Sequence, residues 1–240
     1  MVAAEKEIPE TAIDQVFERL LADIVGGVYP AGVRLPAERE LSRQLGASRP
    51  TLREALRRLD EWNLVEPRRG SGIVIRPYRD WSLEVIAAYL KYGKPQPGQP
   101  SIARIILDLL AVRKAVIIEV VRLTAPRVGK GSTAGARAAM ARAWTNRDQP
   151  SFAREDYEVM RSIAEAAQFT PGLWLLNRIS DLWMDAASSL RFAMRAPDDY
   201  VPTYVKIFDA IEARDTDAAI HILTEYLDRH DNMIAKVLKA

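Results

Sequence analysis

The chain has 240 residues, of which 48% are hydrophobic and 28% charged, with a formal net charge of +2. These values predict a globular protein of two domains and exclude a chain disordered throughout. The absence of cysteine excludes disulfides, thiolate metal ligands and a cysteine nucleophile. No apolar run reaches 18 residues, so we expect a cytoplasmic protein without membrane contacts.

Three helices are predicted in the first 80 residues. Apolar residues recur every three or four positions over 11–26, which is typical of an amphipathic helix. A second helix is predicted to begin at Pro36 and to stop at Gly46, and Ser48 is placed to cap the third. Only three residues separate the second helix from the third, which is the spacing of a helix-turn-helix.

A basic hairpin is predicted after these helices. Two β-prone pieces, 64–66 and 73–75, flank a turn that carries Arg68, Arg69 and Gly70. Three helices and a hairpin wing together predict a winged helix-turn-helix DNA-binding domain over residues 1–80.

The remaining chain is predicted to be helical. Residues 81–100 read as a short connecting helix and a linker, because Gly93 to Pro100 holds three prolines and two glycines. Beyond the linker, residues 101–240 show helical period only, which predicts an all-α antiparallel helical bundle and a mainly α fold class. The predicted helices lie at about 101–127, 132–147, 151–168, 171–194, 200–213 and 215–238.

Positive charge is concentrated in the first of these domains. Between Arg34 and Arg79 there are eleven arginines, six acids and no lysine. Guanidinium groups fork onto phosphates and base edges, so this composition favours nucleic acid as a partner. A solvated, salt-bridged helical surface has the same composition, and charge alone leaves both interpretations open.

The start of the third helix holds the candidate base contacts. The second helix of a helix-turn-helix enters the major groove, where Arg49 and Arg53, four residues apart on one face, can each fork onto guanine. Ser48 and Thr51 are placed to bind a phosphate with the N–H groups of the first turn. Arg69 at the wing tip suits the minor groove.

Three segments resemble the DNA-binding domain of GntR-family bacterial transcriptional regulators: PAGVRLPAEREL at 30–41, SRPTLREAL at 48–56 and RGSG at 69–72. The resemblance implies a homodimer that binds a palindromic operator in double-stranded DNA. It also implies that Arg39, Arg49 and Arg53 are the main helix contacts and that Gly70 lies in the wing. Asn63 stands where the family usually has glycine, and asparagine tolerates left-handed backbone.

The helical half is similar to the FadR-like branch of that family, whose effector domains are six- or seven-helix bundles. One sub-branch binds a metal through an aspartate and three histidines, at positions that correspond to Asp156, Met160, Tyr204 and Tyr226. A thioether and two phenols suit a divalent metal poorly, although His230 would supply one replacement ligand. We therefore expect no metal and no cofactor, and the resemblance is to the metal-free sub-branch, typified by a regulator that binds fatty acyl-CoA.

The last helix carries polar residues on an apolar stripe. Tyr226 and His230 lie on a stripe that continues to Met233, either as core residues satisfied by neighbours or as the lining of a cavity. A buried Arg113 would need a partner, and either Asp156 or an anionic ligand would serve. The candidate effector-binding residues are Arg113, Asp156, Trp183, Tyr204, Tyr226 and His230.

These features predict a ligand-responsive transcriptional regulator and not an enzyme, because the sequence has no glycine-rich phosphate loop, nucleophile elbow or paired-carboxylate motif. The expected effector is a hydrophobic carboxylate or its CoA thioester, with sugar acids and similar small carboxylates as alternatives. The competing hypothesis is a constitutive DNA-binding dimer whose bundle is only a dimerisation scaffold. An enclosed pocket near Arg113, Tyr204 and Tyr226 would favour the first hypothesis, and a solid core would favour the second.

Overall fold

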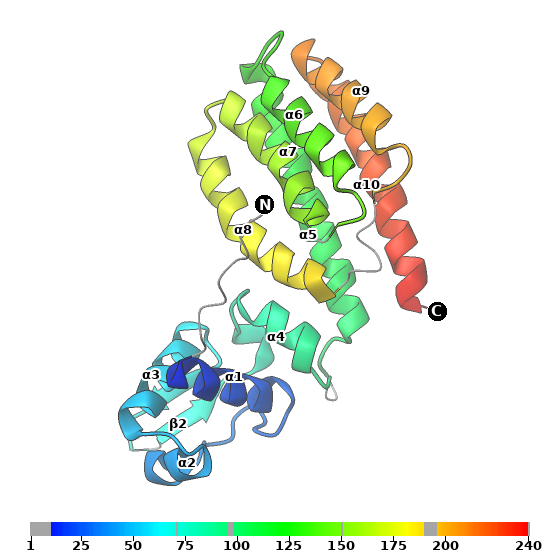
Figure 1. The fold of residues 1–240 in the computed structure, drawn as a ribbon. Coiled ribbons are helices and arrows are strands. Elements are labelled where there is room, and N and C mark those ends of the chain that lie inside the picture. The colour runs from blue at the N-terminus through cyan, green and yellow to red at the C-terminus, as the bar shows by residue number, and fades with distance from the viewer. Residues whose placement is uncertain (1–10, 71, 96–97, 150, 190–195, 240) are drawn as a thin grey trace. The chain divides into compact units, whose positions relative to one another are not determined.

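A computed structural model describes residues 11–70, 72–95, 98–149, 151–189 and 196–239 (Figure 1). The chain divides into two compact units, Met1–Ile102 and Ala103–Ala240. Within the described ranges, none of the helices combines the length and apolarity needed to cross a bilayer.

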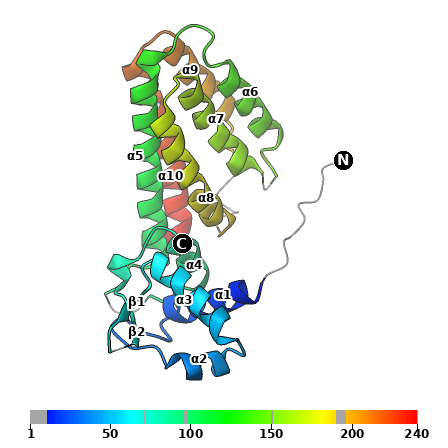
Figure 2. The same cartoon turned by 90° about the vertical axis from the view of Figure 1, so that its left-hand side faces the viewer.

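The first unit is a winged helix-turn-helix, as predicted. Its first three helices are followed by one antiparallel hairpin, in which Val65 pairs with Ile75 and Arg68 with Gly72 (Figure 2). The elements are α1 (Ala12–Val25), α2 (Glu38–Gln44), α3 (Arg49–Glu61), β1 (Val65–Arg68), β2 (Gly72–Ile75), a 3-10 turn (Tyr78–Asp80) and α4 (Val85–Tyr92).

Local capping signals determine where these helices begin and end. The Ser48 hydroxyl accepts the N–H of Thr51 at 3.2 Å and so caps α3, and Asn63 ends that helix with a φ of 58°. Helix α2 begins two residues later than predicted. Ala37 has an extended ψ of 144° and serves as its N-cap, which leaves Pro36 outside the helix.

The core of this unit joins α1 to α3. Helix α1 packs on α3, with Phe17 and Leu20 of α1 buried and Leu52 and Leu59 of α3 both 0% exposed. The Phe17 ring also meets Trp62 edge to face at 4.9 Å between centroids. Because one face of α3 is fixed in this core, its opposite face points outward.

The second unit is an all-α bundle, which confirms the predicted fold class. Figures 1 and 2 show its long helices lying alongside one another. In this unit α6 packs on α7, α7 on α8, and α9 on both α10 and α6. The elements are α5 (Ile102–Thr124), a 3-10 turn (Ala125–Arg127), α6 (Ala134–Thr145), α7 (Phe152–Ala166), α8 (Thr170–Ser189), α9 (Tyr200–Glu212) and α10 (Thr216–Lys239).

The bundle core is rich in aromatic rings. Tyr200 is fully buried between Trp144, which stacks on it at 6.2 Å, and Phe152 at 5.6 Å. The predicted stripe of α10 is wrong at its end, because Met233 is 50% exposed and Ile234 is buried instead. The 3.6-residue period carries the buried face from His230 to the residue four positions on.

Candidate functional site

The outward face of α3 presents two arginines in different states. Arg49 is exposed, and its side chain makes no hydrogen bond or ion pair with any described residue. Arg53 donates from Nε to the Glu38 carboxylate of α2 at 2.8 Å, although its side chain is 70% exposed. An exposed pair of this kind contributes at most about 1 kcal/mol, so Glu38 holds the Arg53 side chain only weakly.

Ser48 and Thr51 lie together at the N-terminus of α3. Their hydroxyl oxygens are 2.7 Å apart, in addition to the cap made by Ser48. The predicted phosphate contacts are thus side by side at the positive end of the helix, beside Arg49.

Most arginines between 34 and 79 are held by acidic neighbours. Among the described residues, the exposed arginines of this stretch whose side chains form no hydrogen bond or ion pair are Arg34, Arg39, Arg49 and Arg69. Three of these four are predicted DNA contacts, and the fourth, Arg34, is not among the predicted residues. The engaged arginines are Arg43 with Glu40, Arg53 with Glu38, Arg57 with Glu54 and Glu61, Arg58 with Asp14, Arg68 and Arg76 with Glu66, and Arg79 with Asp80.

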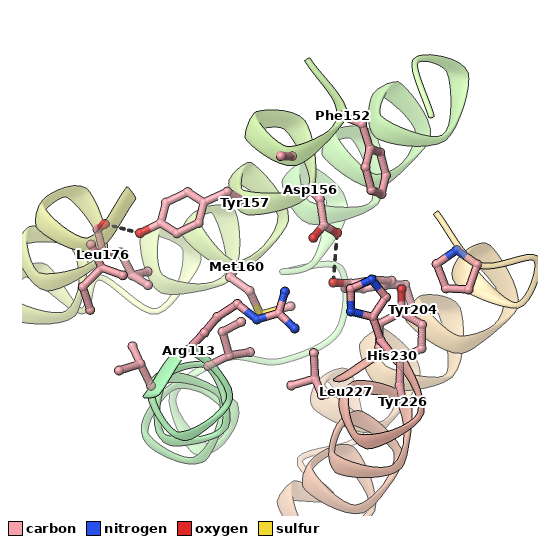
Figure 3. Close-up of a pocket in the computed structure, with 15 residues that line it drawn as sticks. Arg113, Phe152, Asp156, Tyr157, Met160, Leu176, Tyr204, Tyr226, Leu227 and His230 are labelled. Atoms are coloured by element: carbon pink, nitrogen blue, oxygen red, sulfur yellow. Dashed lines mark hydrogen bonds between the residues drawn. The ribbon is translucent and has the colours of Figure 1, made fainter. Parts of the chain in front are cut away.

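The second candidate site is a cavity inside the helical bundle (Figure 3). Side chains from α5, α7, α8, α9 and α10 line it. The volume in which the centre of a water molecule can lie is about 50 Å³. Five of the six predicted effector-binding residues line this cavity, namely Arg113, Asp156, Tyr204, Tyr226 and His230. The sixth, Trp183, has a side chain that falls outside the described part of the structure.

Asp156 places a half-buried carboxylate in the wall of the cavity. Its Oδ1 accepts the hydroxyl of Tyr200 at 2.8 Å and the hydroxyl of Tyr204 at 3.1 Å. Burial raises the pKa of the Asp156 carboxyl, and the hydrogen bond from Tyr200 and the charge of Arg113 offset part of that rise. Burial also raises the pKa of Tyr200, Tyr204 and Tyr226, so these phenols are neutral hydrogen-bond donors at physiological pH.

Arg113 has a partner that the sequence did not indicate. Its Nη2 donates to Oδ1 of Asp231 on α10 at 2.9 Å, and the two side chains are only 12% and 18% exposed. The adjacent His230 is 10% exposed, and its Nδ1 is buried without a hydrogen-bond partner among the described residues. The cavity wall therefore holds a guanidinium and a ring nitrogen that has unused hydrogen-bonding capacity.

Tyr200 and Asp231 are the site residues that sequence reasoning missed. Tyr200 lies one helical turn before Tyr204 on the same face of α9, and this spacing was the signal available. Asp231 pairs with a residue 118 positions earlier in the chain, and no local pattern indicates such a contact.

The donor set around Asp156 does not fit a divalent metal. The carboxylate oxygen already accepts two hydroxyl groups, and the neighbouring positions carry a Met160 thioether and neutral phenols. Across the described ranges, no three His, Cys, Asp or Glu side chains are grouped closely enough to hold a metal ion.

Comparison with known proteins assigns both units. Residues 12–75 match the family described as bacterial regulatory proteins, gntR family, and residues 108–229, just over half of the chain, match the FCD domain. A curated relative, the HTH-type transcriptional regulator Mce2R of Mycobacterium tuberculosis, is 43% identical over 74 residues, which cover 31% of this chain and 29% of the relative.

A second relative matches over a longer range. The fatty acid metabolism regulator protein of Serratia proteamaculans is 31% identical over 157 residues, which cover 62% of this chain and 60% of that protein. The matched regions thus span less than two thirds of either relative. A solved structure of Lar, described as controlling expression of the Listeria monocytogenes agr system, covers 96% of this chain and 99% of its own with a TM-score of 0.61. At 14% identity this likeness concerns the fold alone.

Proposed function

We propose, from the premise that this chain belongs to the gntR family of bacterial regulatory proteins and carries an FCD domain, that a small carboxylate bound in its helical bundle controls its affinity for DNA. The family is one of transcriptional regulators and not of enzymes. The proposal divides the chain into a DNA-binding domain over 1–80, a connecting segment over 81–100 and an effector domain over 101–240.

The observation that carries the proposal is the cavity that Arg113, Asp156, Tyr204, Tyr226 and His230 share. Polar groups from four helices converge there in an otherwise apolar core, which is typical of a ligand site. A scaffold that served only for dimerisation would not require a buried His230 Nδ1 that lacks a hydrogen-bond partner among the described residues.

The size of the cavity favours a small ligand. One water molecule needs about 10–15 Å³ of the volume available to water centres. The 50 Å³ of this cavity therefore holds a few water molecules or a short organic acid. A CoA thioester is many times larger, so of the effectors considered above a small carboxylate fits best. We propose that its carboxylate replaces that of Asp231 on Arg113 and accepts a hydrogen bond from His230.

DNA binding is proposed to use the outward face of α3 and the wing. Two copies of the chain would place two α3 helices on the half-sites of a palindromic operator, with Arg39, Arg49 and Arg53 on base edges. A ligand in the bundle would alter the arrangement of the two heads, and such coupling amounts to about 1–3 kcal/mol.

Binding to the promoter region of the chain's own gene, followed by fluorescence anisotropy, tests the DNA-binding half. We expect Arg49→Ala to abolish preference for this DNA over an unrelated duplex. The matched control is Arg57→Ala on the same helix, because Glu54 and Glu61 hold that arginine. Full specificity in Arg49→Ala would contradict the proposed recognition helix.

Thermal unfolding with monocarboxylates from acetate to octanoate, lactate, sugar acids and acyl-CoAs tests the effector half. A ligand at 100 times its Kd stabilises the native state by about 2.7 kcal/mol. We expect small carboxylates to raise the Tm and Arg113→Met to remove the rise. The control is Arg122→Met on the same helix, where Glu119 pairs with the arginine outside the cavity. Stabilisation by acyl-CoAs alone, or an undiminished rise in Arg113→Met, would contradict the proposal.

A further inference from the structure

Arg34 pairs with the outer strand of the wing, β2, through a single isolated bridge. The N–H of Leu35 donates to the carbonyl of Ile73 at 2.9 Å, and the N–H of Ile75 donates to the carbonyl of Val33 at 2.9 Å. Arg34 itself lies opposite Val74 of β2 in an antiparallel bridge. The backbone of Arg34 is therefore fixed to the hairpin, although it lies before α2 in the sequence.

The Arg34 side chain occupies space that Gly72 leaves open. A Cβ atom at Gly72 would lie 2.7 Å from Nε of Arg34, closer than real Cβ atoms approach a neighbour, and 3.0 Å from its Nη2. Gly72 also has a φ of 77°, a left-handed conformation that favours glycine. The second glycine of the RGSG segment thus provides a seat for a guanidinium.

The seated guanidinium has no acidic partner in the described structure. Arg34 is exposed, and its side chain forms no hydrogen bond or ion pair there. The nearby Arg68 pairs with Glu66, so it is not available in the same way. Arg34 and Arg69 are therefore the arginines of the wing whose charges remain open to an external anion.

We propose that Arg34 is a further DNA contact, which binds a backbone phosphate at the wall of the groove that the wing enters. Gly72 faces Arg68 across the hairpin, immediately before the turn that carries Arg69 and Gly70. The Arg34 guanidinium beside Gly72 therefore lies behind the tip of the wing. We expect it to meet phosphates at the rim of the groove and not base edges inside it. This inference rests on the proposed DNA-facing orientation of the wing.

The salt dependence of DNA binding by the full chain tests the contact. We expect Arg34→Ala to weaken binding to the promoter DNA and to an unrelated duplex by the same factor. The slope of log affinity against log salt should shrink by about 0.9, so the affinity lost between 50 and 200 mM salt becomes roughly 3.5-fold smaller. The matched control is Arg19→Ala, since Asp23 pairs with that arginine on α1. An unchanged slope, or a loss confined to the promoter DNA, overturns the proposal.

A double-mutant cycle with Gly72→Ala tests the seat. We expect Gly72→Ala to weaken DNA binding in the wild-type background and to add little in the Arg34→Ala background. The backbone strain at this position is common to both backgrounds and cancels in the cycle. Additive effects would overturn the role of Gly72. The unrelated duplex separates this test from recognition by α3. Binding to that duplex measures the phosphate contact even if Arg49 makes no contact with bases.

Discussion

Asp231 pairs with Arg113 at the cavity, and replacing it with asparagine tests whether this carboxylate occupies the place of a ligand. The substitution keeps the shape of the side chain and removes its charge. Arg113 stays positive, and Asp156 remains close enough to feel that charge. The variant should therefore fold with an incompletely neutralised guanidinium at the cavity wall.

The cost follows from the burial of the pair. Removing one partner of a fully buried ion pair costs about 3–5 kcal/mol. Here the side chains are 12% and 18% exposed and a second carboxylate lies nearby, so the cost should be lower, at about 2 kcal/mol. A loss of this size lowers the Tm of a unit of this length by about 4–8 °C.

A carboxylate ligand should recover part of this loss. If the ligand carboxylate recovers about 1.4 kcal/mol of the interaction that Arg113 has lost, the ligand binds Asp231→Asn about tenfold more tightly than it binds wild type. Thermal unfolding and titration calorimetry with acetate, butyrate and lactate measure both quantities. We expect a lower Tm without ligand and a larger rise in Tm with it.

Asp228→Asn is the matched control. Asp228 also joins α10 to α5, through Lys114 at 2.5 Å, but neither residue lines the cavity. We expect this variant to lose some stability without gaining affinity for carboxylates. If Asp231→Asn is destabilised and yet binds these acids no more tightly than wild type, the exchange of carboxylates on Arg113 is refuted.

Three further predictions concern individual residues. Hydrogen bonds from Thr11, together with Arg58, lower the pKa of Asp14 from 3.8 to about 2. The stabilising effect of the charged Asp14 is therefore lost as the pH falls through that range. The difference in urea midpoint between wild type and Asp14→Asn should close between pH 4 and pH 2. Burial raises the pKa of Asp156 in the folded state above its ordinary value of 3.8, so the destabilising effect develops as the pH rises from that ordinary value to the raised one and is constant above it. In urea titrations at pH 4 and pH 8, Asp156→Asn should gain stability relative to wild type at the higher pH, and a constant difference would contradict this. Asn63 has a φ of 58°, so Asn63→Ala should cost about 1 kcal/mol in urea unfolding while Asn63→Gly should cost nothing.

Much of the fold is encoded in short-range signals. The Ser48 cap and the left-handed Asn63 both lie where the sequence predicts them, because each acts within one helical turn. Pro36 misleads as a helix start, since proline is also tolerated just before an N-cap such as Ala37. The error at Met233 has a similar origin, because residues three and four positions on from a buried one compete for the same face.

The polar partners were harder to predict. Arg53 with Glu38, and Arg113 with Asp231, are pairs formed between helices, and their geometry depends on packing that no single segment contains. The sequence indicates which residues are arginines but not which arginines are already neutralised. That distinction, which selects Arg34, requires the folded structure.

The two tyrosine hydroxyl groups that donate to Asp156 bear on whether this domain needs a metal ion. A carboxylate stabilised by Tyr200 and Tyr204 does not wait for an ion from the cell, so chelators should leave its melting behaviour unchanged. A metal centre with three histidines at this position would require replacement of Met160, Tyr204 and Tyr226, which line the cavity. The hydrogen bonds from Tyr200 and Tyr204 therefore satisfy the Asp156 carboxylate without a bound cation.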